Sequence, residues 1–249
     1  MGDRRTEGST RYEDRGQVNF HEEWVEQVVS ECGADIREFD PETQAAMPFH
    51  REPWLRWNES DADLVHLLDE YPNGILRRDL KELARGLKTP HERRVAFIAT
   101  LVWGTGKTNR YYGRHADALR SVDLERILEV SARQVRDNNL EGAWSTAAGI
   151  PGLDFRFFTK WLWLAGASAE LPAPPLVYDQ RVRDALVKAS WPSDRRRINN
   201  RRRWVNYCQD AAAVAGTLSG QPSAPTVTSE WVEYWLFSGA PGAERVRLT

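Results

Sequence analysis

Lys160 and Asp179 are two side chains of this 249-residue chain whose types could do chemistry together. Lys160 lies in the apolar run FFTKWLWLA, and Asp179 lies 19 residues further on, in PLVYDQRV. A lysine amine that has lost its proton can form an imine, and a nearby carboxylate can stabilise a developing positive charge. Two simpler interpretations stay open. The lysine could extend its amine from an apolar helix to solvent, and the aspartate could serve only as a helix cap.

A Pro-Gly turn separates two predicted helices shortly before Lys160. The segment reads LEGAWSTAAGIPGLDFRFFTKWLWLAG, and Gly149, Pro151 and Gly152 lie in or beside the turn. Backbone N–H groups of such a turn can bind a DNA phosphate, and glycine lets the phosphate approach closely. The segment therefore predicts a phosphate contact, with an ordinary turn between helices as the alternative.

The segment WGTGKTNRYYGR (103–114) has residue types that suit contact with DNA. Gly104 and Gly106 would permit close approach, and Lys107, Arg110 and Arg114 could meet phosphates, with Asn109 between them. A helix end followed by a solvated loop is the simpler interpretation. GTGKT also resembles the end of a nucleotide-binding P-loop, but that loop needs glycine where this chain has Leu101. The mismatch argues against a nucleoside triphosphatase.

Hydrophobic periodicity predicts that helices position these segments. We expect helices over 18–32, 61–71, 76–87, 140–149, 157–166, 180–191, 204–218 and 229–237, and two short helices across 116–137. Thr89 and Pro90 predict the start of a further helix, as N-cap and first-turn proline. The segment 40–54 contains three prolines and is expected to form turns. The predicted class is all-α, with at most a few short strands.

Composition is that of a globular protein, with 41% hydrophobic and 28% charged residues. No apolar run approaches the length of a membrane span. Cys32 and Cys208 form no metal-binding motif, and the five histidines are scattered, so we predict no metal site made of side chains.

The net charge of −2 conceals an uneven distribution. Residues 1–100 carry −7, whereas residues 101–249 carry +5. Much of the positive charge comes from two arginine triplets: Arg195, Arg196, Arg197, Arg201, Arg202 and Arg203. This block predicts a phosphate-binding surface, with a solvated basic face as the alternative.

Three segments, AFIATLVWGTG, GIPGLDFRFFTKWLWLAG and PLVYDQRVRDAL, resemble the 8-oxoguanine DNA glycosylases of the helix-hairpin-helix superfamily. The resemblance is best over residues 90–190. It implies an all-α helix-hairpin-helix DNA glycosylase fold, with Lys160 as the nucleophile and Asp179 as the carboxylate that stabilises the sugar cation. It also implies that the 103–114 segment enters the duplex at the extruded base, with Asn109 or Tyr111 in the gap.

The chain departs from the family pattern at two positions. The second glycine of the usual Pro-Gly-x-Gly hairpin is Asp154, and Arg156 stands where the catalytic lysine is common. Arginine stays protonated in proteins and cannot form an imine. Lys160, one helical turn later, is therefore the candidate nucleophile, and Arg156 becomes a predicted DNA contact.

The last predicted helix, SEWVEYWLF, offers residues for a base pocket. Glu233 and Phe237 are spaced i, i+4 on one helical face. The carboxylate could accept hydrogen bonds from guanine while the phenyl ring stacks on the base. With Trp103 they make the predicted base pocket. An amphipathic closing helix with one exposed acid is the alternative.

The predicted organisation has three parts: a flexible N-terminus (1–16), an N-terminal helical region (17–88) and a glycosylase core with a closing helix (89–249). The predicted function is a DNA glycosylase and AP lyase for an oxidised purine, with 8-oxoguanine as the expected lesion. A non-catalytic DNA-binding protein and a monofunctional glycosylase of the same fold stay open as alternatives.

The expected partner is double-stranded DNA that contains a damaged base, bound by a monomer without membrane attachment. The expected location is the cytoplasm, in association with the nucleoid. We expect no cofactor. The resemblance implies at most a monovalent cation held by backbone carbonyls of the hairpin.

Overall fold

The computed structural model describes residues 15–58, 60–107, 111–192, 199–221 and 226–247, with side chains from residue 21 onward. Its α-helices are α1 (Arg15–Ile36), α2 (Arg51–Asn58), α3 (Ala62–Glu70), α4 (Arg77–Ala84), α5 (Pro90–Thr105), α6 (Tyr112–Arg120), α7 (Leu124–Arg136), α8 (Leu140–Ala147), α9 (Phe155–Gly166), α10 (Gln180–Lys188), α11 (Asn200–Ser219) and α12 (Ser229–Phe237). Short 3₁₀ turns are η1 (Pro41–Thr43) and η3 (Ala243–Arg245). Within these ranges the only β pairing is an isolated bridge between Met47 and Ile75. The predicted all-α class is confirmed.

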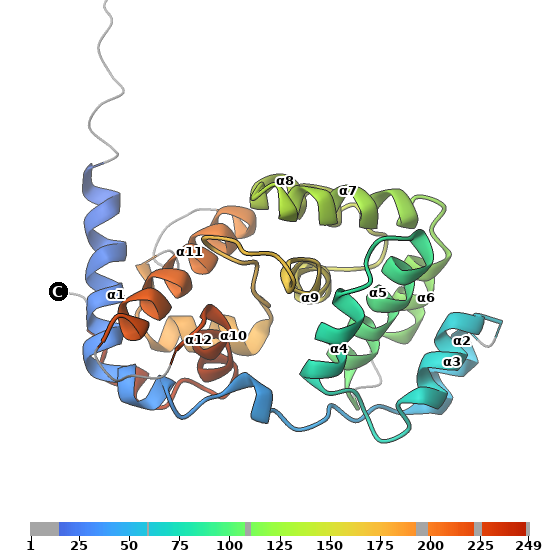
Figure 1. Cartoon of the computed structure of the whole chain (residues 1–249), viewed down its shortest axis with the longest axis horizontal. Helices are drawn as coiled ribbons and strands as arrows, with labels where there is room; N and C mark the ends of the chain where they lie inside the picture. Colours follow the sequence, from blue (N-terminus) through green and yellow to red (C-terminus); the bar gives the residue numbers. More distant parts are fainter. Residues whose placement is uncertain (1–14, 59, 108–110, 193–198, 222–225, 248–249) are drawn as a thin grey trace, which may run out of the picture.

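Helix α9 is the centre of the fold. Figure 1 shows it end-on, and it contacts α4, α5, α7 and α8. Every residue from Phe157 to Gly166 is buried. A helix that is apolar on all sides is stable only when other helices surround it. The apolar run in the sequence is therefore explained by a helix with no solvent-facing side, in which Lys160 is the only charged residue of the buried stretch.

Helix α5 begins as the sequence predicts. Thr89 accepts from the backbone N–H of Glu92, Glu92 bonds back to Thr89, and Pro90 is in the first turn. This reciprocal cap satisfies N–H groups that no helical carbonyl can reach. The helix continues through Leu101 to Thr105, so the GTGKT segment begins inside a buried helix, unlike a P-loop, and Gly106 ends that helix.

The proline-rich segment 40–54 differs from the prediction. It contains the turn η1, as expected, but its last four residues begin α2. Pro53 is the third residue of that helix. A proline in the first helical turn loses no hydrogen bond, because the N–H groups there have no partner in the helix. The expectation of turns throughout this segment was wrong for that reason.

The helices of the region 17–88 lie in different parts of the molecule. Helix α1 lies against α11 and α12, whereas α4 lies against α5 and α9 (Figure 1). Residues 1–14 of the predicted flexible N-terminus lie outside the described residues. None of the described helices is long and apolar enough to cross a membrane.

The Pro-Gly turn joins α8 to α9 and lies against α6. Gly152 has φ +74°, in the left-handed region. A Cβ on this residue would lie 2.6 Å from the carbonyl oxygen of Arg114. Both the backbone conformation and the close approach of α6 therefore require glycine. The requirement comes from contacts inside the protein, whether or not DNA also approaches the turn.

Gly152→Ala should destabilise the protein by about 1–3 kcal/mol, because it combines an unfavourable φ with a clash against the backbone. Gly216→Ala is the matched control, since no atom other than its chain neighbours and the backbone of α11 itself lies within 4 Å of its Cβ position. That change should leave stability unchanged or raise it by up to about 1 kcal/mol. Urea unfolding measures both. Equal stabilities for the two variants would contradict the packing of the turn on α6.

Candidate active site

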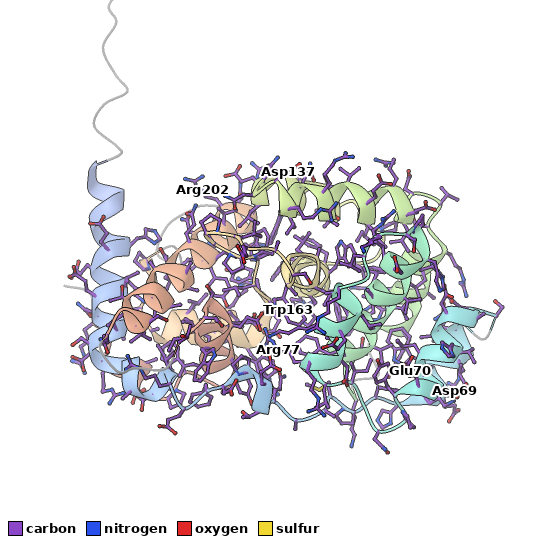
Figure 2. The ribbon with its side chains drawn as sticks, viewed as in Figure 1. Asp69, Glu70, Arg77, Asp137, Trp163 and Arg202 are labelled. Atoms are coloured by element: carbon purple, nitrogen blue, oxygen red, sulfur yellow. The ribbon has the colours of Figure 1, made fainter. Side chains whose placement is uncertain are left out.

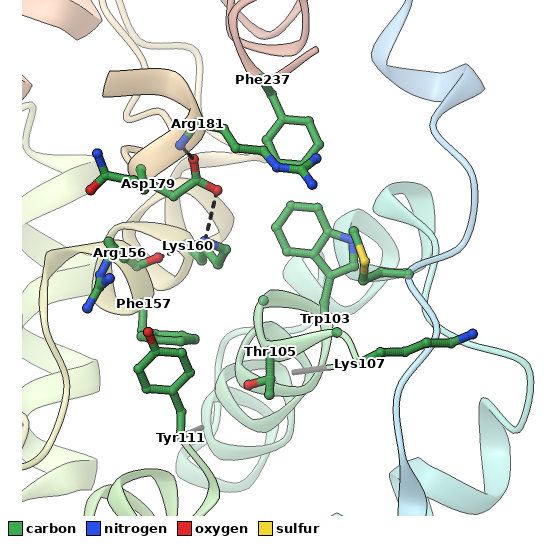
Figure 3. A pocket seen from close by; sticks show the side chains of 14 residues that line it. Trp103, Thr105, Lys107, Tyr111, Arg156, Phe157, Lys160, Asp179, Arg181 and Phe237 are labelled. Carbon is green, nitrogen blue, oxygen red and sulfur yellow. Dashed lines mark hydrogen bonds and ion pairs between the residues drawn. The ribbon is translucent and has the colours of Figure 1, made fainter. Parts of the chain in front are cut away.

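A cavity of about 350 Å³ lies where the end of α5, helix α9, the start of α10 and the end of α12 meet. Figure 3 shows its lining side chains. Nine residues that the sequence analysis singled out line it: Trp103, Gly104, Gly106, Lys107, Tyr111, Arg156, Lys160, Asp179 and Phe237. The rest of the lining is Met47, Thr105, Phe157, Gln180 and Arg181. The fold thus brings together four segments that are distant in the sequence.

Lys160 and Asp179 lie next to each other in the wall of the cavity. Their Nζ and Oδ2 atoms are 3.6 Å apart, and the side chains are 7% and 16% exposed. Lys160 also donates a hydrogen bond to the carbonyl oxygen of Arg156, at 2.7 Å. The distance between amine and carboxylate is longer than a hydrogen bond. The two groups form an ion pair, and both residues line the cavity, where a bound molecule could contact them.

The start of helix α10 fixes the orientation of Asp179. Oδ1 accepts from the backbone N–H groups of Arg181 and Val182, at 3.0 and 3.2 Å. The positive end of the helix favours a negative charge at this position. The predicted cap is confirmed, and it does not use the whole carboxylate, because Oδ2 points at Lys160. Asp179 therefore has one structural oxygen and one oxygen in the site.

Gly104 provides the space in which the Lys160 side chain lies. A Cβ on Gly104 would be 2.5 Å from Cδ of Lys160 and 2.9 Å from Cε. The sequence suggested that this glycine allows close approach of DNA. In the structure its open side is filled by the lysine, so the glycine sets the path of the amine from α9 to the cavity.

Aromatic rings form two walls of the cavity. Trp103 stacks on Trp163 with ring centroids 5.8 Å apart, and Phe157 lies edge-on to Tyr111 at 5.0 Å. Behind Phe157 lies His115, at 4.6 Å. Burial lowers the pKa of His115 to about 3, so this ring is neutral near pH 7. The contact of His115 with this wall was not predicted, because a lone histidine in an amphipathic helix carries no distinctive pattern.

At the opposite side of the cavity, Arg181 covers the ring of Phe237, with its guanidinium carbon 4.9 Å from the ring centroid. The position of Arg181 in the cavity was not predicted from the sequence either. Its position two residues after Asp179, on the first turn of α10, was the signal that could have found it.

Arg156 and Asp154 form an ion pair at the start of α9. Asp154 caps the helix by accepting from the backbone N–H of Arg156, and it also accepts from Nε of that residue at 3.0 Å. Burial alone would raise the pKa of Asp154, but its hydrogen bonds from Arg156 hold that pKa below the usual value. The positive charge of Arg156 thus offsets the negative charge of Asp154, the residue that replaces the second hairpin glycine. Arg156 keeps part of its side chain at the cavity.

The structure does not place Glu233 in the cavity. Its carboxylate is 2% exposed and accepts from Nη1 and Nη2 of Arg77, each at 3.0 Å. It also accepts from the backbone N–H of Val177 at 3.1 Å. A carboxylate held by three donors in the core is not available to a base. Phe237, one turn later at the end of α12, does reach the cavity.

The remaining basic residues are only partly described. Asn109, Arg110 and the triplet Arg195–Arg197 lie outside the described residues. In the second triplet, Arg202 and Arg201 lie 3.0 and 3.8 Å from the carboxylate of Glu141 on α8. This carboxylate offsets part of the positive charge that the sequence suggested for a phosphate-binding surface.

Comparison with known families gives one result. A family described as "Putative 8-oxoguanine DNA glycosylase OGG-like protein" matches residues 40–237, about four fifths of the chain. The chain belongs to this family. The matched range of this glycosylase family includes the Pro-Gly turn, Lys160, Asp179 and Phe237. Comparisons with curated proteins and with solved structures found no match.

A double-mutant cycle tests the contact between Gly104 and Lys160. Gly104→Ala alone should cost about 1–3 kcal/mol, because the methyl group displaces the lysine side chain. In a Lys160→Ala background the same change should cost far less, since the two closest contacts of the methyl group are then removed and the Phe157 ring lies at an ordinary van der Waals distance of 3.7 Å. Urea unfolding of the four proteins should give a coupling free energy of about 0.5–3 kcal/mol. Additive costs would show that the lysine does not occupy this space.

Proposed function

We propose that this protein is a DNA glycosylase and AP lyase that removes an oxidised purine, with 8-oxoguanine as the substrate, from double-stranded DNA. The observation that carries the proposal is the Lys160–Asp179 pair, 3.6 Å apart in the wall of a cavity of about 350 Å³. Membership of an 8-oxoguanine DNA glycosylase family supports the same reaction class.

In the proposed reaction, Nζ of Lys160 attacks C1′ of an extruded nucleotide. The bond from C1′ to the base nitrogen breaks, and the base leaves with the bonding electrons and takes up a proton. After the amine loses its proton, ring opening gives an imine. Removal of a proton from C2′ then expels the 3′ oxygen and cuts the strand. Arg156 cannot replace Lys160 in this sequence, because an imine needs an amine that can be deprotonated.

Asp179 acts on the sugar through Oδ2. Breaking the bond to the base builds positive charge on the deoxyribose, and a fixed carboxylate stabilises that charge. The helix cap holds the other oxygen, so the carboxylate needs little reorientation during the reaction. The partly buried setting makes this stabilisation stronger than it would be in water.

The base would enter the cavity between its aromatic walls. Enzymes that act on a base in a duplex extrude it into such a pocket. Phe237 and Trp103 lie in the lining and are the proposed base contacts. Trp103 reaches the cavity from the end of α5 and Phe237 from the end of α12, so a base placed between them would contact two separate helices.

DNA contacts are proposed for the turn between α8 and α9 and for the segment after α5. Backbone N–H groups around Gly149, Pro151 and Gly152 would bind a phosphate, as in helix-hairpin-helix proteins, with a monovalent cation on the carbonyls of the turn. Lys107, Arg156 and the adjoining Asn109 and Arg110 would contact the strand that enters the cavity. A monomer on nucleoid DNA is the proposed form.

A monofunctional glycosylase is the second candidate. The observation that favours it is the hydrogen bond from Lys160 Nζ to the carbonyl oxygen of Arg156. A lysine with that bond and a carboxylate partner is well suited to remain a structural ammonium. In this variant of the mechanism, Asp179 would assist the attack of water.

Lys160→Gln should abolish borohydride trapping on a duplex that contains 8-oxoguanine, because glutamine cannot form the imine. Strand cutting should disappear with it, while the affinity for the duplex changes less than threefold. Covalent trapping is read on a denaturing gel. A trapped adduct with this variant would contradict the assignment of the nucleophile. Release of free base by the wild type without trapping would select the monofunctional candidate.

Asp179→Asn should slow base release by orders of magnitude, because it removes the carboxylate but keeps a side chain that can cap α10. Single-turnover release of the base measures the effect, and thermal unfolding should show a change of only a few degrees. A loss smaller than tenfold, about 1.4 kcal/mol of barrier, would make Asp179 a structural cap only.

A further inference from the structure

The residues just before Asp179 form a buried, non-helical segment. Leu176, Val177 and Tyr178 are at most 1% exposed. Buried backbone N–H and C=O groups outside a helix need partners from elsewhere. The carbonyl oxygen of Leu176 accepts from Nε1 of Trp204 at 2.8 Å, and Val177 N–H donates to Glu233 at 3.1 Å. The segment is thus attached to α11 and α12.

Thr159 supplies the hydrogen-bond partner of the next buried N–H group, that of Tyr178. Its Oγ1 accepts from the backbone N–H of Tyr178 at 3.1 Å and donates to the carbonyl oxygen of Phe155 at 2.7 Å. Thr159 is fully buried and directly precedes Lys160, just as Tyr178 directly precedes Asp179. One hydrogen bond therefore joins the neighbours of the two groups that face each other in the cavity.

Glu233 gives this arrangement a rigid support. Its carboxylate is held by both terminal nitrogens of Arg77, at 3.0 Å each. The guanidinium of Arg77 lies over the ring of Trp163 on α9, 4.5 Å from the centroid, and Figure 2 shows the two side chains together in the middle of the molecule. The segment before Asp179 is thereby tied to α9 on both sides of Lys160.

We infer that Thr159 is a positioning residue whose hydroxyl sets the separation between Lys160 Nζ and Asp179 Oδ2. The inference rests on the proposed function, in which these two groups act on the same sugar. Without the hydroxyl, the Tyr178 N–H loses its acceptor, and the segment must shift to satisfy it. Asp179 moves with the segment, while Lys160 stays on α9. Misplacement of reacting groups by about 1 Å can cost about a hundredfold in rate.

Thr159→Val and Thr159→Ser are the informative pair, because valine keeps the shape of threonine without the hydroxyl and serine keeps the hydroxyl. Thr100→Val is the matched control. Thr100 is fully buried on the neighbouring helix α5, and its hydroxyl bonds only to the carbonyl oxygen of Phe97 in the same helix. Each variant is compared with wild type for unfolding temperature, affinity for a duplex with a non-cleavable abasic analogue, and single-turnover release of 8-oxoguanine.

Thr159→Val should slow base release by about tenfold to a hundredfold. Thr159→Ser should stay within threefold of wild type, as should Thr100→Val. Affinity for the abasic-analogue duplex should change less than twofold in all three, because none of the changed groups reaches the surface. Thr159→Val within twofold of wild type, or Thr159→Ser as slow as Thr159→Val, would overturn the inference. If Thr159→Val does not fold, Thr159→Ala takes its place with the same expectations.

Amide hydrogen exchange gives a reading that does not depend on activity. Exchange of the Tyr178 N–H, followed by NMR, should be at least tenfold faster in Thr159→Val than in wild type or Thr159→Ser, and unchanged in Thr100→Val. Unchanged exchange in Thr159→Val would overturn the inference even if the rate fell. A wild type that releases no base from any oxidised-purine duplex would instead contradict the proposed function, and the exchange comparison would still decide whether Thr159 holds this segment.

Discussion

The burial of a lysine in a wholly enclosed helix is the constraint on which the site depends. Helix α9 is surrounded by α4, α5, α7 and α8, and Lys160 is 7% exposed within it. An ammonium group in such surroundings is costly unless it is paired and hydrogen-bonded. The carbonyl oxygen of Arg156 and the carboxylate of Asp179 meet that need. The Lys160–Asp179 pair links α9 to the start of α10 in the wall of the cavity.

The partner carboxylate is restrained in turn by its own surroundings. Oδ1 of Asp179 is committed to the first turn of α10, and the residues before it are bonded to α9, α11 and α12. In the proposed reaction such a network would favour catalysis, because groups that are already in place need no reorganisation in the transition state. The same network explains why Glu233 lies in the core. Its charge balances Arg77 and holds the segment before Asp179, and this task excludes it from the cavity.

Two glycines allow close contacts within this fold that a Cβ atom would prevent. Gly104 leaves room for the stem of Lys160, and Gly152 lets the turn before α9 approach the carbonyl oxygen of Arg114. Both were expected to face DNA, and both meet the protein's own chain. Asp154 is similar, because the carboxylate that replaces the second hairpin glycine caps α9 and pairs with Arg156. The close contacts at these two glycines are therefore contacts within the protein itself.

The sequence alone determined the features that depend on near neighbours: the helical class, the Thr89 and Asp179 caps, and the Pro-Gly turn. Caps and turns are visible in sequence because their hydrogen bonds span two to four residues. Tertiary structure alone decided which residues share the cavity. Glu233 and Phe237 lie on one predicted helical face, yet one is bound by Arg77 and the other lines the cavity. Contacts between distant segments also place His115 behind Phe157, Arg181 in the lining of the cavity, and Glu141 beside Arg201 and Arg202. Such contacts depend on how the helices pack, and no local pattern records that packing.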